Sequence, residues 1–192
     1  MKSVLISIQP KWCELIASGK KTIEVRKTRP KIETPFKCYI YETKGKQKLL
    51  EVMKDGAPLY GDTYHGDPVF IKGSSAGSAK VIGEFVCDKI ESLYVYSEGG
   101  SSFYWQGFEK SCLTKQECEK YIGYGKTGYG WHISDLKIYD KPKELGEFRK
   151  NCPATNPNSC LGCKYHKYEH LYPVCDDKVT HPPQSWCYVE EI

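Results

Sequence analysis

The sequence lacks any long run of apolar residues. Val4 to Ile8 is followed by Pro10, which is too short for the core of an export signal. No stretch approaches the roughly 18 apolar residues of a membrane span. These absences predict a cytoplasmic protein without a membrane segment. The ten cysteines are then expected to be reduced thiols or metal ligands, and not a disulfide framework.

Arginine is also scarce, and we find no internal repeat. Only three of the 28 basic residues are arginines, namely Arg26, Arg29 and Arg149. A planar guanidinium can bind a carboxylate or phosphate at two points, which draws attention to Arg26. The net charge of +4 permits a nucleic-acid or nucleotide partner without requiring one. With 192 residues, 40% hydrophobic and 27% charged, we expect one packed domain, or one domain with a small appendage.

Residues 16–26 hold the densest group of polar side chains. Gly19 can adopt the left-handed conformation that ends a helix. In the strand that follows, Glu24 and Arg26 share one face, with Lys21 beside them and apolar residues on the other face. The alternative interpretation is a solvated strand face whose ion pair contributes little.

Short strands separated by short helices are predicted along the rest of the chain. We expect a helix that begins at Pro10 and one that runs from the capping box of Thr114 and Glu117 to Ile122. The other predictions are strands at 3–8, 36–42, 80–92, 131–139 and 185–192, a helix at 46–54, and a last short helix after Asp140. This pattern predicts an α+β protein, a small mixed or mainly antiparallel β-barrel with helices packed around it.

The motif Gly19-x-Lys21-x-x-Glu24-x-Arg26, placed after a strand and a short helix, resembles the signature of the ASCH domain in the PUA-like superfamily. The resemblance extends to Ile6-x-x-x-Pro10-Lys11-Trp12, to Gly83-Glu84-Phe85, and to 132–136 and 182–187, where it is similar to phage-related and bacterial members with a cysteine-bearing insertion. It covers most of 3–140 and 182–192. It implies a PUA-like small barrel with a cleft that receives RNA, a modified base or a nucleoside.

In such a cleft the resemblance places Lys21, Glu24 and Arg26 at the floor or rim. A carboxylate can accept from the exocyclic amine of a base, and the two cations can hold phosphate. Further ligand-binding candidates are Lys11, Trp12, Tyr41, Trp131 and Trp186, whose aromatic members can stack on a base. For each aromatic taken alone, a core position is the commoner role.

The resemblance also leaves an enzyme open. One branch resembles an amidohydrolase acting on 4-acetylcytidine, which uses a lysine, a threonine three residues later and a glutamate. Lys21 matches the lysine, but Glu24 occupies the position of the hydroxyl nucleophile. Another branch resembles a ribonuclease, for which Lys21, Tyr41 and Ser185 are candidates. We therefore predict a module that binds RNA or a modified nucleotide, with a hydrolase that uses Lys21 as its catalytic residue as the alternative.

Four cysteines mark a segment with little apolar sequence. The spacing is Cys152-x7-Cys160-x2-Cys163-x11-Cys175, and four thiolates suit a closed structural zinc site that supplies folding energy. His166 or His170 are substitute ligands, and reduced cysteines or adventitious disulfides are the alternatives. We predict a barrel from 1–150 with 181–192 and a zinc-binding insertion at 151–180, which a third hypothesis makes a docking surface for another protein. The other six cysteines are expected in the core.

Overall fold

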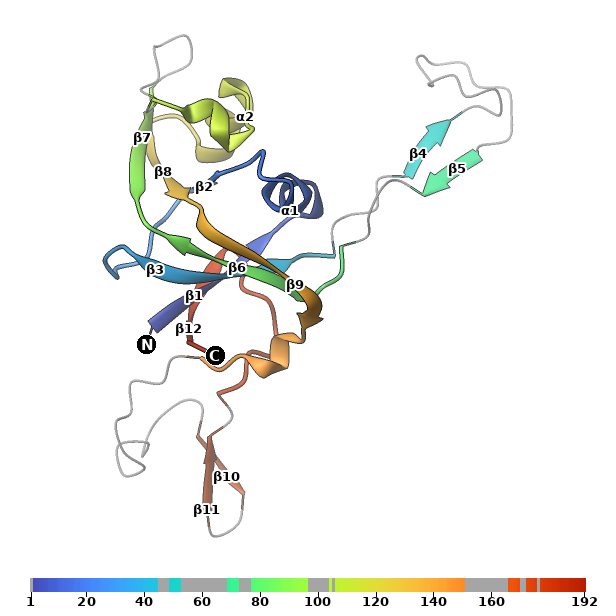
Figure 1. The fold of residues 1–192 in the computed structure, drawn as a ribbon, viewed down its shortest axis with the longest axis vertical. Helices are drawn as coiled ribbons and strands as arrows, with labels where there is room; N and C mark the ends of the chain where they lie inside the picture. The colour runs from blue at the N-terminus through green and yellow to red at the C-terminus, as the bar shows by residue number, and fades with distance from the viewer. Residues whose placement is uncertain are drawn as a thin grey trace.

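The structure is a computed structural model that describes residues 2–44, 77–96, 104, 106–150 and 177–192, together with the backbone of 49–52, 69–72, 166–169 and 172–175. Two sheets organise it (Figure 1). The five-stranded sheet has the order β12-β1-β3-β6-β9, and the three-stranded sheet has the order β2-β8-β7. Their strands are β1 (Lys2–Ile8), β2 (Ile23–Arg26), β3 (Phe36–Glu42), β6 (Val81–Cys87), β7 (Ile90–Val95), β8 (Lys126–His132), β9 (Ser134–Lys143) and β12 (Trp186–Glu190).

Short elements complete the fold. The helices are α1 (Pro10–Ala17) and α2 (Lys115–Ile122), and the 3-10 turns are η1 (Phe108–Ser111) and η2 (Leu145–Glu147). Two separate hairpins pair β4 (Leu49–Val52) with β5 (Val69–Lys72) and β10 (His166–Glu169) with β11 (Tyr172–Cys175). In the part of the chain that is described, no helix is long and apolar enough to cross a membrane.

The strands that the structure describes pair mostly antiparallel, with one parallel pair. β1 lies parallel to β3, because the chain crosses through α1 and β2 before it returns to the first sheet, whereas β12 runs antiparallel to β1 on the other side. Among the described residues no strand ladder joins the two sheets. The structure therefore shows an α+β fold of two sheets and two short helices, and closure into a barrel stays a prediction.

Local signals explain both helices. Pro10 occupies the first turn of α1, where its missing amide proton costs nothing. Cys13 and Ile16, three residues apart, are buried against the sheets. Gly19 ends the turn after the helix with a φ of +72°. The capping box of Thr114 and Glu117 is present at the start of α2. These predictions are confirmed.

Three predictions of secondary structure are corrected. The helix at 46–54 is wrong, because Leu49–Val52 is a strand that pairs with the distant β5. The strand at 80–92 is two strands, separated at residues 88 and 89. After Asp140, β9 continues to Lys143, and only the short turn η2 follows, capped by Glu144 and Glu147.

The predicted zinc ligands cannot be placed. Cys152, Cys160 and Cys163 lie outside the described residues, as does the substitute His170, and only the backbone is described at Cys175 and His166. The chain leaves the described fold after Lys150 and returns at Asp177, whose carbonyl accepts from the Lys150 amide at 2.7 Å. A segment that leaves and returns at one point is compatible with an insertion at 151–180. Its boundaries and its zinc stay predictions.

The remaining cysteines are packed thiols. Cys13, Cys38, Cys87 and Cys118 are buried, and Cys112 and Cys187 are half-buried. Burial raises the pKa of the Cys118 thiol to about 11 and that of Cys87 to about 12. These values indicate unreactive core residues, and a core role is confirmed for the four buried ones.

Candidate functional site

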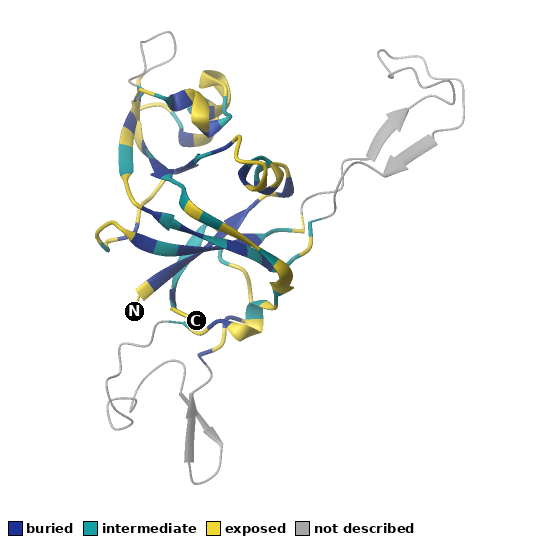
Figure 2. Cartoon of the chain, viewed as in Figure 1, coloured by how far each residue is buried: buried dark blue, intermediate teal, exposed yellow. Residues whose placement is uncertain are grey.

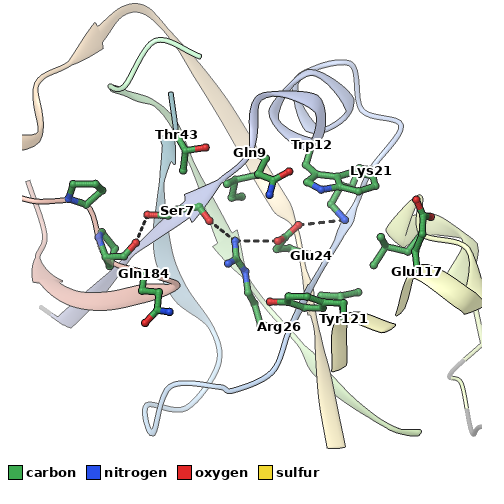
Figure 3. A pocket seen from close by; sticks show the side chains of 15 residues that line it. Ser7, Gln9, Trp12, Lys21, Glu24, Arg26, Thr43, Glu117, Tyr121 and Gln184 are labelled. Atoms are coloured by element: carbon green, nitrogen blue, oxygen red, sulfur yellow. Dashed lines mark hydrogen bonds and ion pairs between the residues drawn. The ribbon is translucent and has the colours of Figure 1, made fainter. Parts of the chain in front are cut away.

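A cavity of about 510 Å³ lies where α1, β2 and α2 meet the chain that leads into β12 (Figure 3). This volume is within the range of small-molecule sites in proteins. The lining combines charged, amide and aromatic side chains with a few apolar ones: Ser7, Ile8, Gln9, Trp12, Lys21, Glu24, Val25, Arg26, Thr43, Leu113, Glu117, Tyr121, Pro182, Pro183 and Gln184.

Strand alternation brings Glu24 and Arg26 into the cavity. β2 pairs with β8, with Glu24 opposite Trp131 and Arg26 opposite Tyr129. Ile23 and Val25, which alternate with them along β2, belong to the apolar cluster around α2. Glu24 and Arg26 are only 6% and 7% exposed. The solvated strand face considered as the alternative is therefore excluded.

Lys21 is fixed by three acceptors. Its ammonium donates to the carbonyls of Ile23 at 2.9 Å and Ser111 at 2.6 Å, and it lies 3.2 Å from Glu24 Oε2. A lysine has three hydrogens to donate, so all of them have acceptors. The ammonium also lies 5.1 Å from the centre of the Trp12 ring. These contacts hold the Lys21 side chain in one position beside Glu24.

Glu24 bridges the two cations. Its Oε1 is 3.0 Å from Nη2 of Arg26, while Oε2 faces Lys21. A carboxylate offers about four acceptor positions, so both oxygens retain the capacity to accept from a ligand. Two cations and one acid give these three residues, which we call the charged triad, a net charge of +1.

Arg26 is the member of the charged triad with unused donors. Nη2 donates to the carbonyl of Ser7 at 2.6 Å, and Nη1 makes a long contact of 3.5 Å with Ser185 Oγ. Nε is buried and has no hydrogen-bond partner among the described residues. Burial raises the pKa of the neighbouring Tyr121, although the charge of Arg26 and a hydrogen bond to it act in the opposite direction. The weak contact of Nη1 therefore leaves the guanidinium a donor for a ligand, whereas the buried Nε does not face the cavity.

Aromatic side chains flank the charged triad. Figure 3 shows Glu24 between Trp12 and Tyr121, which come from α1 and α2. Tyr121 is 38% exposed, so its ring is accessible from the cavity mouth. A planar ligand can contact either ring while its edge faces the triad.

Glu117 gives the rim the opposite charge. It lines the cavity from the first turn of α2. The amide and the hydroxyl of Thr114 donate to its carboxylate, which lowers the pKa of Glu117 below its ordinary value. An ionised acid at the rim and a net positive triad at the floor orient a polar ligand.

Several predicted ligand-binding residues lie elsewhere, which corrects the sequence analysis. Tyr41 and Trp131 are buried in two different apolar clusters, and Trp131 is fully buried with its ring edge-on to Phe36 at 5.9 Å. Trp186 packs 6.0 Å from Trp131 and donates to Thr28 Oγ1. Trp131 and Trp186 belong to the core where the two sheets meet, and Tyr41 belongs to the core on the other face of the five-stranded sheet.

Lys11 is exposed and does not line the cavity either. Its ammonium lies 4.5 Å from the centre of the Trp12 ring. Of the eight predicted residues, the structure therefore brings together Trp12, Lys21, Glu24 and Arg26.

Sequence reasoning missed the wall contributed by α2. Glu117 and Tyr121 are four residues apart, so they share one face of that helix. The capping box located the helix, and this spacing was the available signal. Gln9, Thr43 and Gln184 are brought in by tertiary structure alone, and no local pattern marks them.

The fold and the site define an α+β domain of two sheets, with a charged cavity between its N-terminal helix and its second helix. The family model of the ASCH domain matches residues 6–124, more than half of the chain. The chain belongs to the ASCH domain family.

Solved structures of ZmASCH from Zymomonas mobilis are similar to this chain. A crystal structure of a tyrosine-to-phenylalanine mutant has a TM-score of 0.53 at 16% identity and covers 100% of this chain and 92% of its own. The structure of ZmASCH itself has a TM-score of 0.52 at 16% identity, with coverages of 98% and 88%. At this identity the likeness shows the fold alone. No curated protein matches the chain.

Proposed function

We propose that the cavity binds the base of an RNA residue or of a modified nucleotide. The observation that carries the proposal is Glu24, held between Lys21 and Arg26 and buried at the floor of a cavity with an aromatic ring on either side. Burial of a charged acid costs free energy of desolvation even when a cation lies on both sides of it. This cost gives a buried triad little value as a stabilising ion pair, and its position in a cavity supports a role in binding.

The donors and acceptors of the site fit a base that carries an exocyclic amine. Glu24 can accept from such an amine, as acids do for cytosine. Nη1 of Arg26, which makes only a long contact with Ser185, can meet a ring nitrogen, a carbonyl or a phosphate. Uracil presents a carbonyl where cytosine presents its amine, and this oxygen would face the acid. The proposal therefore favours cytosine-type bases over uracil.

The hydrolase alternative has less support. Lys21 has an acceptor for each of its hydrogens, and Tyr41, its partner in the ribonuclease hypothesis, is buried away from the cavity. Ser185 is at the edge, 3.5 Å from Arg26, with no base beside it among the described contacts. These contacts favour recognition over turnover.

Titration calorimetry at low salt tests binding. We expect cytidine 5′-monophosphate or 4-acetylcytidine to bind, and uridine 5′-monophosphate to bind more weakly. Arg26→Lys keeps the charge but loses the fork, and should weaken binding about five-fold or more, as expected for a two-point contact. Arg149→Lys is the matched control, because Arg149 lies outside the cavity. Failure of the wild type to bind any nucleoside, nucleotide or RNA contradicts the proposal.

Incubation with 4-acetylcytidine and with RNA tests the alternative. Recognition without catalysis predicts no product from the wild type. Product that is formed by the wild type and lost in Lys21→Ala would replace the binding proposal with the hydrolase.

A further inference from the structure

The β7–β8 side of the three-stranded sheet carries exposed tyrosines on the face opposite α2. Buried and exposed positions alternate along the end of β7 (Figure 2). Leu93 and Val95 are buried under α2, while Tyr94 is 39% exposed. Tyr96 follows two residues later and is 48% exposed. The two rings meet edge to face, with centroids 4.8 Å apart. Large apolar rings in such positions are available to a partner.

Tyr129 extends this surface toward the cavity. On β8 it is opposite Ser92 of β7 and also opposite Arg26 of β2, so its ring lies on the same face as Tyr94. We call Tyr94, Tyr96 and Tyr129 the tyrosine face. A hollow of about 320 Å³ lies against it, lined by Arg29, Ile90, Ser92, Thr127 and Tyr129. The tyrosine face thus begins one strand away from the charged triad.

The segment 27–31 adds positive charge along the same path. Its sequence is Lys-Thr-Arg-Pro-Lys, without an acid, and all three cations are exposed. The Lys27 ammonium lies 5.1 Å from the Tyr121 ring at the cavity, and the Arg29 guanidinium lies 5.8 Å from the Tyr129 ring. The segment therefore places a cation beside an aromatic at both the cavity and the hollow.

We infer that the tyrosine face and segment 27–31 bind the single-stranded RNA that flanks the nucleotide held in the cavity. Bases stack on Tyr94 and Tyr96, and phosphates contact Lys27 and Arg29. Aromatic rings interleaved with cations suit a single strand, because every base has a face to stack and every residue a phosphate to neutralise. This inference rests on the proposed function and names its ligand as a strand rather than a free nucleotide.

Fluorescence polarisation with a fluorescein-labelled cytidine octaribonucleotide tests this inference. The double variant Tyr94→Ala and Tyr96→Ala should lose about five-fold or more in octamer affinity, the lower limit for one lost stacking contact. Competition by cytidine 5′-monophosphate should be unchanged, because the cavity is intact. Ile138→Ala is the control, an exposed apolar residue (41%) on the other sheet.

Salt dependence supplies a second readout that a folding defect does not mimic. Arg29→Ala should reduce the slope of log affinity against log salt by about 0.7, whereas Lys141→Ala on β9 should not. Equal octamer affinity in the tyrosine variant and the Ile138 control overturns the inference while the cavity proposal stands. If the wild type binds neither octamer nor mononucleotide, the proposed function fails, and this inference fails with it.

Discussion

Two networks of charged side chains lie at the two sheets, one buried and one exposed. Lys21, just before β2, and Glu24 and Arg26 on β2 have side chains that are 2%, 8% and 8% exposed. At the five-stranded sheet, Lys37 of β3 pairs at 3.0 Å with Glu191, which follows β12, and lies 3.9 Å from Glu84 of β6; these side chains are 28%, 33% and 21% exposed. Water screens the second network and not the first. Burial beside a cavity, rather than the presence of ion pairs, distinguishes a site from a surface.

Removal of the Glu24 carboxylate from the buried network should have the largest effect, which is a loss in the free energy of unfolding. Glu24→Gln leaves Lys21 and Arg26 close together without a counter-charge. The loss of one partner from a buried pair costs about 3–5 kcal/mol of the free energy of unfolding. Guanidinium chloride unfolding of the wild type and the variant measures this cost. A loss as small as that of a surface pair would mean that the network is solvated.

Removal of either aromatic ring that flanks the cavity should have the second-largest effect, which is a loss of ligand affinity. Trp12→Ala and Tyr121→Ala should each cost about 1–3 kcal/mol in the binding of a cytidine nucleotide, the range for one base stacked on an aromatic ring. Titration calorimetry measures this loss, with Ile138→Ala as the matched control. Unchanged affinity in both wall variants would show that the ligand does not lie against either ring.

Low pH should destabilise the start of helix α2, which lines one side of the cavity. Hydrogen bonds from Thr114 lower the pKa of Glu117 below its ordinary value of 4.5. A lowered pKa in the folded state means that this stabilisation is complete above about pH 4.5 and is lost as the pH falls through the folded value. Nuclear magnetic resonance of α2 amides between pH 6 and pH 3 follows the change. Glu117→Gln should remove this pH dependence, and its persistence in that variant would assign it to another group.

A substitution in the exposed network of Lys37, Glu84 and Glu191 should have the smallest effect on the free energy of unfolding. Glu191→Gln removes an ion pair with Lys37 whose side chains are about a third exposed. We expect a loss of about 1 kcal/mol or less, measured by the same unfolding experiment as Glu24→Gln. A cost equal to that of Glu24→Gln would remove the distinction between the two networks.

Sequence reasoning succeeded where the determinants are local. Gly19 and the capping box of Thr114 and Glu117 act within one turn of the chain, and the alternation of β2 placed Glu24 and Arg26 on one face. Gly19, Glu24 and Arg26 also belong to the motif on which the family resemblance was based.

The sequence did not predict features that depend on contacts between distant segments of the chain. Residues 49–52 form a strand because β5 pairs with them. Trp131 is core because Phe36 and Trp186 pack on it, which its own neighbours in sequence do not indicate. Tyr121 reaches the cavity because α2 is placed beside β2; its spacing from Glu117 marks a shared helix face but does not show what that face meets.

A crystal structure with cytidine 5′-monophosphate bound is the most direct test of the central claim. The account predicts the base in the cavity, with its exocyclic amine within hydrogen-bond distance of Glu24, its ring against Trp12 or Tyr121, and Arg26 donating to the base or its phosphate. A nucleotide bound elsewhere on the molecule, with the charged triad making no contact to it, would contradict the account.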